Sequence, residues 1–281
     1  MVAVCSNPYR DTDLILAKKC VSILEEAGFE TMICPVFAQP GEEILPKDVL
    51  CRSVVEIRSE VSLAVVIGGD GTILSVSRDL QEHTVPILGV NLGTMGFMTF
   101  LEPEDIGLVV KAARGEARLS ERMMIDVSLR RGDEIVYHGT ALNDAYIHGY
   151  GDTIILHAMC DGQTITSYSG DGIIFSTPTG STGYSLSAGG PVVEPETENI
   201  LVTPICAHTM VSRSFVLGPA RVASVTAKRL HDRRAYLSVD GYVSADIRQD
   251  DVLIVRKSSH KTLFADLGVK SFYENTYEKL T

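Results

Sequence analysis

The sequence lacks an excess of positive charge, and this absence excludes two classes of partner. Its 281 residues hold 25 Lys and Arg against 36 Asp and Glu, a net charge of −11, and the basic residues are scattered along the chain. Proteins that bind nucleic acid or anionic membranes by electrostatic attraction present a basic face. We therefore expect neither partner, although an anionic small molecule can still bind through backbone amides and a metal ion.

Closely spaced cysteines and long apolar runs are also missing. No C-x-x-C pair occurs, so the sequence predicts neither a zinc site nor a disulfide framework. We expect most of the six cysteines to be reduced and buried: Cys5, Cys20, Cys34, Cys51, Cys160 and Cys206. No apolar run approaches the roughly 18 residues of a membrane span, and the residues after Met1 do not resemble a signal peptide. We therefore expect a cytoplasmic protein.

What the chain does contain is enough apolar sequence for two domains. It is 45% hydrophobic, and domain statistics favour two cores at this length. Residues 1–115 alternate short apolar strands with helical patterns, which predicts βαβ crossovers and a Rossmann-like α/β domain with a mostly parallel sheet. Residues 116–260 show strand-like alternation with Gly-Asp and Asp-Gly turns, which predicts a β-rich, sandwich-like domain. Residues 261–281 are expected to form a C-terminal tail, for which packing on the first domain is one option.

The predicted elements of the first domain place two loops on the same edge of its sheet. Predicted strands cover residues 2–5, 29–36, 63–67 and 85–90, and predicted helices cover residues 11–27, 103–114 and a stretch from Thr72. Ligands on parallel sheets bind at the carboxyl ends of strands. We therefore expect the glycine-rich residues 68–71 and the loop at residues 91–97 to face one cleft.

The most informative local feature is an acid among three glycines, Gly68-Gly69-Asp70-Gly71, directly after an apolar run. Glycines let a bulky anion approach main-chain N–H groups, and the helix predicted from Thr72 adds a favourable dipole. A carboxylate there would repel phosphate unless it holds a metal ion, orients a sugar hydroxyl or takes a proton from one. Asp70 is therefore the first candidate for chemistry. The alternative is that the glycines form a tight turn and Asp70 caps the helix.

A second polar segment, residues 169–191, is rich in hydroxyl groups and glycines. Segments this polar rarely form core, so we expect it to line a site or to form an exposed loop. Its short side chains offer donors and acceptors suited to a ribose, an adenine edge or a carboxamide. The alternative is a Ser/Thr-rich loop in which Ser181 or Thr182 caps a helix.

Taken together, these motifs resemble the NAD kinase family, and they run in the family's order from the first domain to near the end of the second. The matching stretches are residues 68–72, 91–97, 141–144, 171–191 and 203–206, followed by His208, Arg213 and residues 238–241. Residues 68–72 alone are only moderately specific, since diacylglycerol and sphingosine kinases resemble them. The Ser-Thr-Pro-Thr-Gly-Ser-Thr stretch is much more selective for NAD kinases.

The resemblance implies a phosphotransferase with an alcohol group as acceptor. Such enzymes transfer a phosphoryl group from ATP or polyphosphate to the adenosine ribose 2′-hydroxyl of NAD, giving NADP, with Mg²⁺ or another divalent cation. The resemblance also implies an active site between the two domains and a homodimer or homotetramer. It leaves open the donor, the preference for NAD or NADH, feedback by NADPH, the subunit count and the residues that contact the donor phosphates.

The resemblance further implies roles for individual residues. Asp70 would lie beside the ribose 2′-hydroxyl as the catalytic residue, and a metal contact through the magnesium-bound phosphates is left open. Asn143 and Asp144 would engage the adenine and ribose portion of the dinucleotide. The other residues expected to bind the nucleotides are Gly68, Gly69, Gly71, Thr72, Phe97, Asp171, Ser176, Thr179, Thr182, Gly183, Tyr184 and Ser187. In several relatives the loop after Asp171 also reaches the ligand of a neighbouring subunit.

Three positions depart from the family pattern. Asp144 stands where the family usually has Glu, which keeps the charge on a shorter side chain. Gly183 replaces a common Ala, which loosens the loop or opens space beside the ligand. Ser214 replaces a Pro, so the rigid turn usual there is in doubt.

Two other functions compete with this interpretation. A lipid kinase would share residues 68–72 but needs an apolar tunnel, whereas the hydroxyl-rich residues 176–187 offer the opposite. A catalytically silent dinucleotide sensor would bind NAD or NADPH without making NADP. Retention of Asp70, Asp144 and Asp171 speaks against such a sensor.

Overall fold

The computed structural model describes residues 1–93, 96–209, 213–230 and 233–280. Thr94 and Met95 of the motif at residues 91–97 therefore lie outside the described residues. The chain divides into two compact units, one formed by Met1–Glu121 with Lys261–Thr281 and the other by Arg122–His260. It passes between them within two long strands, β5 (Arg118–Arg131) and β16 (Val252–Asp266). The second unit is thus an insertion in the first.

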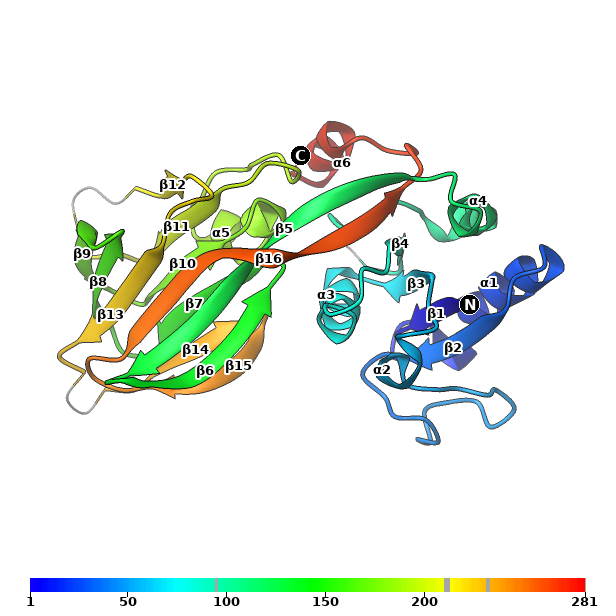
Figure 1. Ribbon diagram of the computed structural model, residues 1–281, viewed down its shortest axis with the longest axis horizontal. Helices are drawn as coiled ribbons and strands as arrows, with labels where there is room; N and C mark the ends of the chain where they lie inside the picture. Colours follow the sequence, from blue (N-terminus) through cyan, green and yellow to red (C-terminus); the bar gives the residue numbers. More distant parts are fainter. Residues whose placement is uncertain (94–95, 210–212, 231–232, 281) are drawn as a thin grey trace. The chain divides into compact units, whose positions relative to one another are not determined.

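The first unit is built on a parallel sheet in the order β2-β1-β3-β4, to which β16 adds through Phe264 opposite Ile87 (Figure 1). This confirms the predicted α/β fold. Its strands are β1 (Val2–Ser6), β2 (Thr31–Pro35), β3 (Leu63–Gly68) and β4 (Ile87–Asn91). Its helices are η1 (Thr12–Leu14), α1 (Ile15–Glu26), α2 (Val54–Ile57), α3 (Asp70–Asp79), η2 (Pro103–Leu108), α4 (Val109–Ala113) and α6 (Phe272–Leu280).

Burial in this sheet follows from its apolar sequence. All six residues of β3 are buried, as expected for a central parallel strand covered on both faces. Helices α1 and α4 pack on each other, and their apolar residues join the core formed with β1 and β3. Most element boundaries differ from the prediction by one to four residues. The differences that bear on the site are that α3 begins at Asp70 rather than at Thr72 and that residues 103–108 form a 3₁₀ segment before α4.

The second unit is β-rich, as predicted. One antiparallel sheet has the order β12-β11-β10-β7-β14-β15, and the other strands are β8, β9, β13, β5 and β6 with part of β16 (Figure 1). Apolar residues from both groups of strands meet in a single core. The strands not yet given are β6 (Glu134–Ala141), β7 (Asp144–Gly149), β8 (Ile154–Cys160), β9 (Gln163–Gly170), β10 (Gly172–Ser176), β11 (Ile200–Ile205), β12 (Phe215–Leu217), β13 (Ala223–Lys228), β14 (Ala235–Val239) and β15 (Tyr242–Ile247), with two short helices η3 (Thr179–Thr182) and α5 (Tyr184–Ser187).

The expectation that residues 169–191 contribute little to the core is wrong for part of this segment. Strand β10 lies between β7 and β11, and all five of its residues are buried. Ile173 and Phe175 belong to the main core of the unit. The polar residues on both sides of these apolar ones concealed a short central strand.

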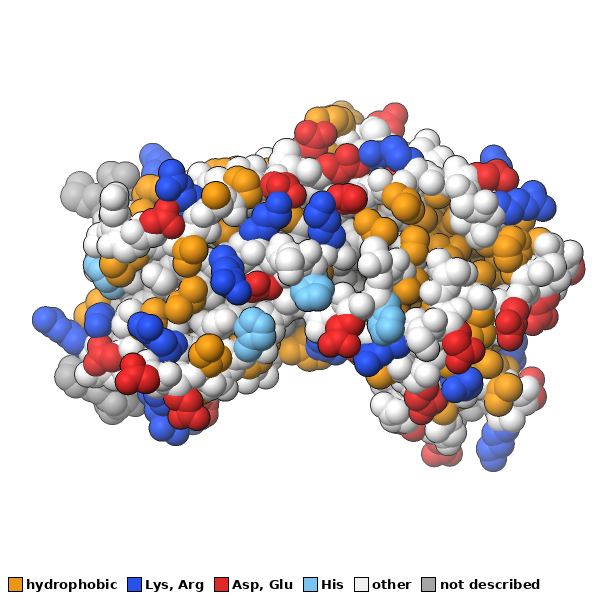
Figure 2. Space-filling model, viewed as in Figure 1, with side chains coloured by type: hydrophobic (Ala, Val, Ile, Leu, Met, Phe, Trp, Pro, Cys, Tyr) orange, Lys and Arg blue, Asp and Glu red, His pale blue; other side chains and the backbone are white. Residues whose placement is uncertain are grey.

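The distribution of charged side chains on the surface agrees with the scattering of basic residues along the sequence. On the face drawn in Figure 2, acidic and basic side chains are interspersed rather than gathered by sign. Among the described residues, no helix is long and apolar enough to cross a membrane. Cys206 is exposed, unlike Cys5, Cys20 and Cys34, which are buried as expected.

Candidate functional sites

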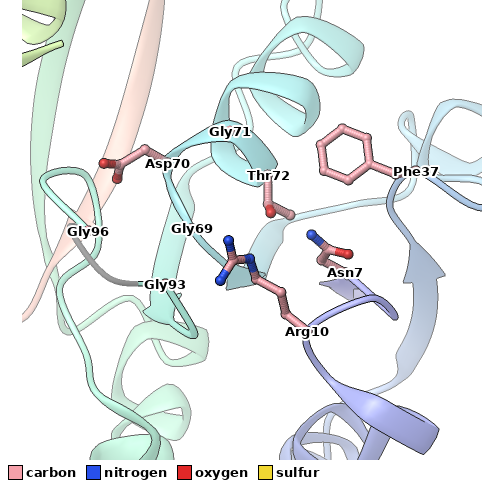
Figure 3. Close-up of a pocket in the computed structure, with 9 residues that line it drawn as sticks. All are labelled: Asn7, Arg10, Phe37, Gly69, Asp70, Gly71, Thr72, Gly93 and Gly96. Atoms are coloured by element: carbon pink, nitrogen blue, oxygen red, sulfur yellow. The ribbon is translucent and has the colours of Figure 1, made fainter.

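A pocket of about 300 Å³ opens at the carboxyl ends of β1 and β3 in the first unit. Adjacent strands bring its loops together: the Asn7 N–H donates to Ile67 O, and the Leu92 N–H donates to Gly68 O. Figure 3 shows the residues that line it: Asn7, Arg10, Phe37, Gly69, Asp70, Gly71, Thr72, Gly93 and Gly96. Of the residues expected to bind nucleotide in this unit, Gly69, Gly71 and Thr72 line the pocket.

Two glycines at this pocket, Gly68 and Gly93, are closely packed against neighbouring atoms. A Cβ on Gly68 would lie 2.3 Å from the Thr72 hydroxyl oxygen, so only glycine fits beneath the first turn of α3. A Cβ on Gly93 would lie 3.3 Å from the Gly69 Cα, so the two loops approach backbone to backbone. Backbone N–H groups near a helix N-terminus then border the pocket without side chains in front of them, which suits an anion.

Asp70 is the first residue of α3, but its carboxylate does not cap that helix. Its oxygens accept hydrogen bonds from the Phe97 N–H at 3.1 Å and the Met98 N–H at 3.0 Å. Figure 3 shows the carboxylate directed toward the loop that carries Gly96 and away from Arg10. The helix-capping alternative for Asp70 is therefore wrong, and the Phe97 backbone supplies one of the two N–H groups that hold its carboxylate.

Arg10 supplies a positive charge that the sequence analysis did not assign. It lines the pocket, and its guanidinium donates to Leu92 O at 3.4 Å. Asn7 and Phe37 were also missed as lining residues, whereas Gly93 and Gly96 belong to the loop at residues 91–97 that was expected to face one cleft with residues 68–71. The sequence did hold a signal for Asn7 and Arg10. Both follow the first predicted strand, and the carboxyl end of that strand lies at the same sheet edge as the glycine motif.

In the second unit, Asp240 organises the loop that carries Asn143 and Asp144. Its carboxylate accepts hydrogen bonds from three successive N–H groups, those of Leu142, Asn143 and Asp144, at 2.8, 2.8 and 3.1 Å. Its own N–H donates to Asp144 O. Asp240 and Gly241 both have positive φ in the turn between β14 and β15. Asp240 therefore belongs to a turn and, through its carboxylate, also binds the loop that carries Asn143 and Asp144.

The loop at residues 142–144 and Asp240 form a small polar site, called the cradle below. The Asp144 carboxyl group is buried in this cradle, with only 5% of the residue exposed. Burial raises its pKa to about 7, and the negative charge of Asp240 acts in the same direction. Gly183 lies beside it, because a Cβ there would be 3.6 Å from Asn143 Nδ2 and 4.0 Å from Asp144 Oδ2. The alanine common in the family would therefore be in ordinary contact with both side chains.

Three buried polar atoms near this loop have no hydrogen-bond partner among the described residues: Asn143 Oδ1, Thr179 Oγ1 and Ser238 Oγ. Ser238 pairs in register with Tyr146, which lies two residues beyond Asp144 on β7. The side chains of Ser238, Tyr146 and Asp144 therefore share one face of the sheet. Buried polar groups in native proteins are almost always paired. These three atoms therefore have hydrogen-bonding capacity that the described residues leave unused, and a polar ligand or ordered water could take it up.

The hydroxyl groups of the segment at residues 176–187 have different partners: some bind the loop that carries Asn143, some bind other backbone groups, and some are exposed. Thr177 donates from both its N–H and its hydroxyl to the loop carrying Asn143. Ser181 binds both backbone groups of Val193, so it holds the chain and caps no helix, and Thr182 caps none either. Ser176 is buried and bonded to backbone, whereas Ser187 is exposed on α5.

Tyr184 joins a row of aromatic side chains that sequence reasoning missed. Ring centroids lie 5.0 Å apart for Tyr184 and Tyr146, 6.2 Å for Tyr146 and Tyr236, and 4.7 Å for Tyr236 and Tyr150. Partial burial raises the pKa of the Tyr184 phenol. Alternation along β7 was a usable signal, since Asp144 and Tyr146 lie two residues apart on one face.

Asp171 lies at the opposite end of β10 from Asp144, and, together with burial, its negative charge raises the pKa of Tyr184. Asp171 precedes β10, whereas Ser176, at the other end of the same strand, pairs with Asp144. Five residues of strand span roughly 17 Å. The Asp171 carboxylate instead accepts a hydrogen bond from the Cys206 thiol, and this contact raises the pKa of the thiol.

The described residues contain no group of three or more His, Cys, Asp and Glu side chains that could hold a metal ion. Mg²⁺ in nucleotide enzymes is commonly held by one or two carboxylates and the phosphates of the substrate. Asp70, the carboxylate that lines the pocket in the described part of the chain, fits that mode of binding.

Comparison with known proteins accounts for both units. A family model described as the ATP-NAD kinase N-terminal domain matches residues 2–114, and one described as the C-terminal domain matches residues 142–267. A curated NAD kinase from Trichlorobacter lovleyi is 40% identical over 80% of each chain. One from Geotalea daltonii is 34% identical over 93% of this chain and 94% of its own.

Solved structures extend the similarity to the fold. Yeast NADH kinase complexed with NADH superposes with a TM-score of 0.86 at 23% identity, over 99% of this chain and 86% of that one. An NAD kinase from Archaeoglobus fulgidus in complex with ATP gives a TM-score of 0.77 at 27% identity, over 100% of this chain and 98% of that one.

Proposed function

Since the chain belongs to the NAD kinase family, we propose that it transfers the terminal phosphoryl group of ATP to the adenosine ribose 2′-hydroxyl of NAD, giving NADP. The observation that carries this proposal is that one chain holds two sites whose chemistry suits the two substrates. One is an anion pocket with a carboxylate at its edge, and the other is a polar cradle with orphaned buried atoms. ATP is favoured over polyphosphate because a structural relative was solved with ATP.

The cradle of the second unit is proposed to bind the dinucleotide. Asn143 Oδ1, Thr179 Oγ1 and Ser238 Oγ have unused hydrogen-bonding capacity suited to the hydroxyl and amino groups of a nucleoside. Asp144 would accept hydrogen bonds from ribose hydroxyls, which favours its ionised form. Tyr184 and Tyr146 offer faces on which a base can stack. Thr182, Gly183 and Ser187 belong to the same binding segment.

The pocket of the first unit is proposed to hold the phosphates of the donor. The N-terminus of the ten-residue helix α3 and the glycine backbone would bind phosphate oxygens. Arg10 would add a fixed positive charge, and Asn7 and Thr72 lie beside it in the same pocket (Figure 3). Phosphoryl transfer depends mainly on alignment and charge neutralisation, and this pocket supplies groups for both.

Asp70 is proposed to orient the 2′-hydroxyl and to accept its proton. The two backbone N–H groups that bind its carboxylate stabilise the ionised form and fix its orientation. Each carboxylate oxygen keeps a further lone pair for the hydroxyl proton. A divalent cation bound with the donor would neutralise phosphate charge.

We also propose a homo-oligomer, as the family resemblance implies. Asp171 lies at the far end of β10 from Asp144. The resemblance implies that the loop after Asp171 reaches the dinucleotide of a neighbouring copy, and we include that contact in the proposal.

The test is NADP formation by the purified chain with NAD, ATP and Mg²⁺. We expect product with NAD, none with diacylglycerol as acceptor, and none when the divalent cation is removed. Asp70→Asn should lose activity by about 10²-fold or more while NAD still binds, because general-base help is worth about 10²- to 10⁴-fold. NAD binding without NADP formation by the wild-type chain would instead support the sensor. Near-wild-type turnover of the variant would refute the role of Asp70.

A further inference from the structure

The C-terminal helix α6 contacts the loop that binds Asp70. Lys279 Nζ donates to Gly96 O at 2.7 Å, and Asn275 Nδ2 donates to the same oxygen at 3.3 Å. The residues that follow Gly96, Phe97 and Met98, provide the two N–H groups bound by the Asp70 carboxylate. One carbonyl oxygen thus connects the last helix of the chain to the backbone that orients Asp70.

Lys279 is also electrostatically coupled to this site. Its ammonium lies 5.8 Å from the centre of the Phe97 ring. Burial lowers its pKa, while the carboxylates of Asp70, Glu102 and Glu278 raise it and the ammonium of Lys270 lowers it. These are the charged groups that face it from α3, from the residue before η2 and from its own segment. The net effect brings its loss of charge closer to neutral pH.

We propose that Lys279 is a positioning residue for phosphoryl transfer, which it serves by holding Gly96 O and thereby fixing the N–H groups that orient the Asp70 carboxylate. This inference rests on the proposed function for its catalytic consequence. The contact itself is independent of that function. No step of the reaction is assigned to the Lys279 amine.

A cationic donor is required for the strongest form of this contact. Hydrogen bonds from an ionised donor are roughly twice as strong as neutral ones. Lys279→Met keeps the length and apolar stem of the side chain but removes the donor. Lys279→Arg keeps a donor and a charge that persists at alkaline pH. Lys270→Met is the matched control, because Lys270 lies beside the same helix and pairs with Glu278 rather than with the loop.

The first measurement is steady-state NADP formation as a function of pH. For Lys279→Met we expect kcat to fall by about 10- to 100-fold with KM for NAD changed less than about threefold, since small misplacements of a reacting group have effects of this size. For the wild-type chain kcat should decline at alkaline pH. Lys279→Arg should restore most of kcat and move that decline to higher pH, and Lys270→Met should behave as wild type.

The second measurement is hydrogen exchange of the Phe97 and Met98 amides in the full chain, which needs no substrate. We expect exchange at least about tenfold faster in Lys279→Met and unchanged in Lys270→Met. Unchanged exchange, unchanged kcat, failure of Lys279→Arg to restore activity, or an equal loss in both Met variants would each overturn the proposal. A wild-type chain that makes no NADP would refute the proposed function alone, because the exchange rates would still decide whether Lys279 holds the loop.

Discussion

Burial of the Asp144 carboxyl group should make the stability of this protein depend on pH in a defined direction. The pKa of this group is about 7 in the folded chain, against roughly 3.9 for an unperturbed Asp. Between these values the folded state retains a proton that the unfolded state has lost. Stability contributed by the protonated group is therefore full below about pH 4 and is lost as pH rises through 7. Three pKa units correspond to at most about 4 kcal/mol.

Asp144→Asn removes the titration while keeping the shape of the side chain. At pH 8 the variant should be more stable than the wild-type chain, by up to about 4 kcal/mol, and the difference should shrink toward zero at pH 4. Urea denaturation from pH 4.5 to 8.5 measures this difference directly. Asp133→Asn, at an exposed position between β5 and β6, is the control and should stay within about 0.5 kcal/mol of wild type throughout. A gap between Asp144→Asn and wild type that is the same at pH 5 and pH 8 would refute the reasoning.

Three further predictions follow from the same two sites. Asp240→Ala leaves the three N–H groups at residues 142–144 without their acceptor, so it should destabilise the fold by about 3 kcal/mol by urea denaturation; a loss below about 0.5 kcal/mol would contradict this. Gly180→Ala would place a Cβ 2.2 Å from Asn143 O and should destabilise by about 3 kcal/mol, whereas Gly183→Ala meets nothing closer than 3.3 Å and should change stability by less than about 1 kcal/mol. Equal losses of stability in the two alanine variants would show that the close contact between residue 180 and Asn143 O does not determine the loss. Arg10→Met should raise KM for ATP by about tenfold or more and leave KM for NAD within about twofold, because it removes one charge-assisted contact with phosphate; an unchanged KM for ATP would remove Arg10 from the donor site.

The sequence was sufficient to predict what depends on local pattern. The parallel strands of the first unit follow from apolar runs separated by helical periodicity, and the structure confirms the α/β and β-rich classes. The glycine motif was correctly placed at the end of a buried strand, although Gly68 is the last residue of that strand rather than the first residue after it. Each of these features needs only neighbouring residues to specify it.

Contacts between distant residues could not be predicted in this way. Asp70 is bound by residues 27 and 28 positions later in the chain, and Asp240 is bound by residues almost a hundred positions earlier. No periodicity reports such pairs, because they depend on how the sheets assemble. Strand β10 was missed for a related reason: its apolar residues are few, and their burial comes from the strands on either side.

The insertion of the second unit within the first has a consequence for how the protein is made. Phe264 of β16, which pairs with Ile87, and the helix that contacts Gly96 both emerge from the ribosome after the whole of residues 122–260. The inserted unit is complete in sequence at residue 260, whereas the outer one stays incomplete until residues 261–280 have been made. Premature termination near residue 260 would therefore release a polypeptide whose opening segment lacks the pieces that complete it.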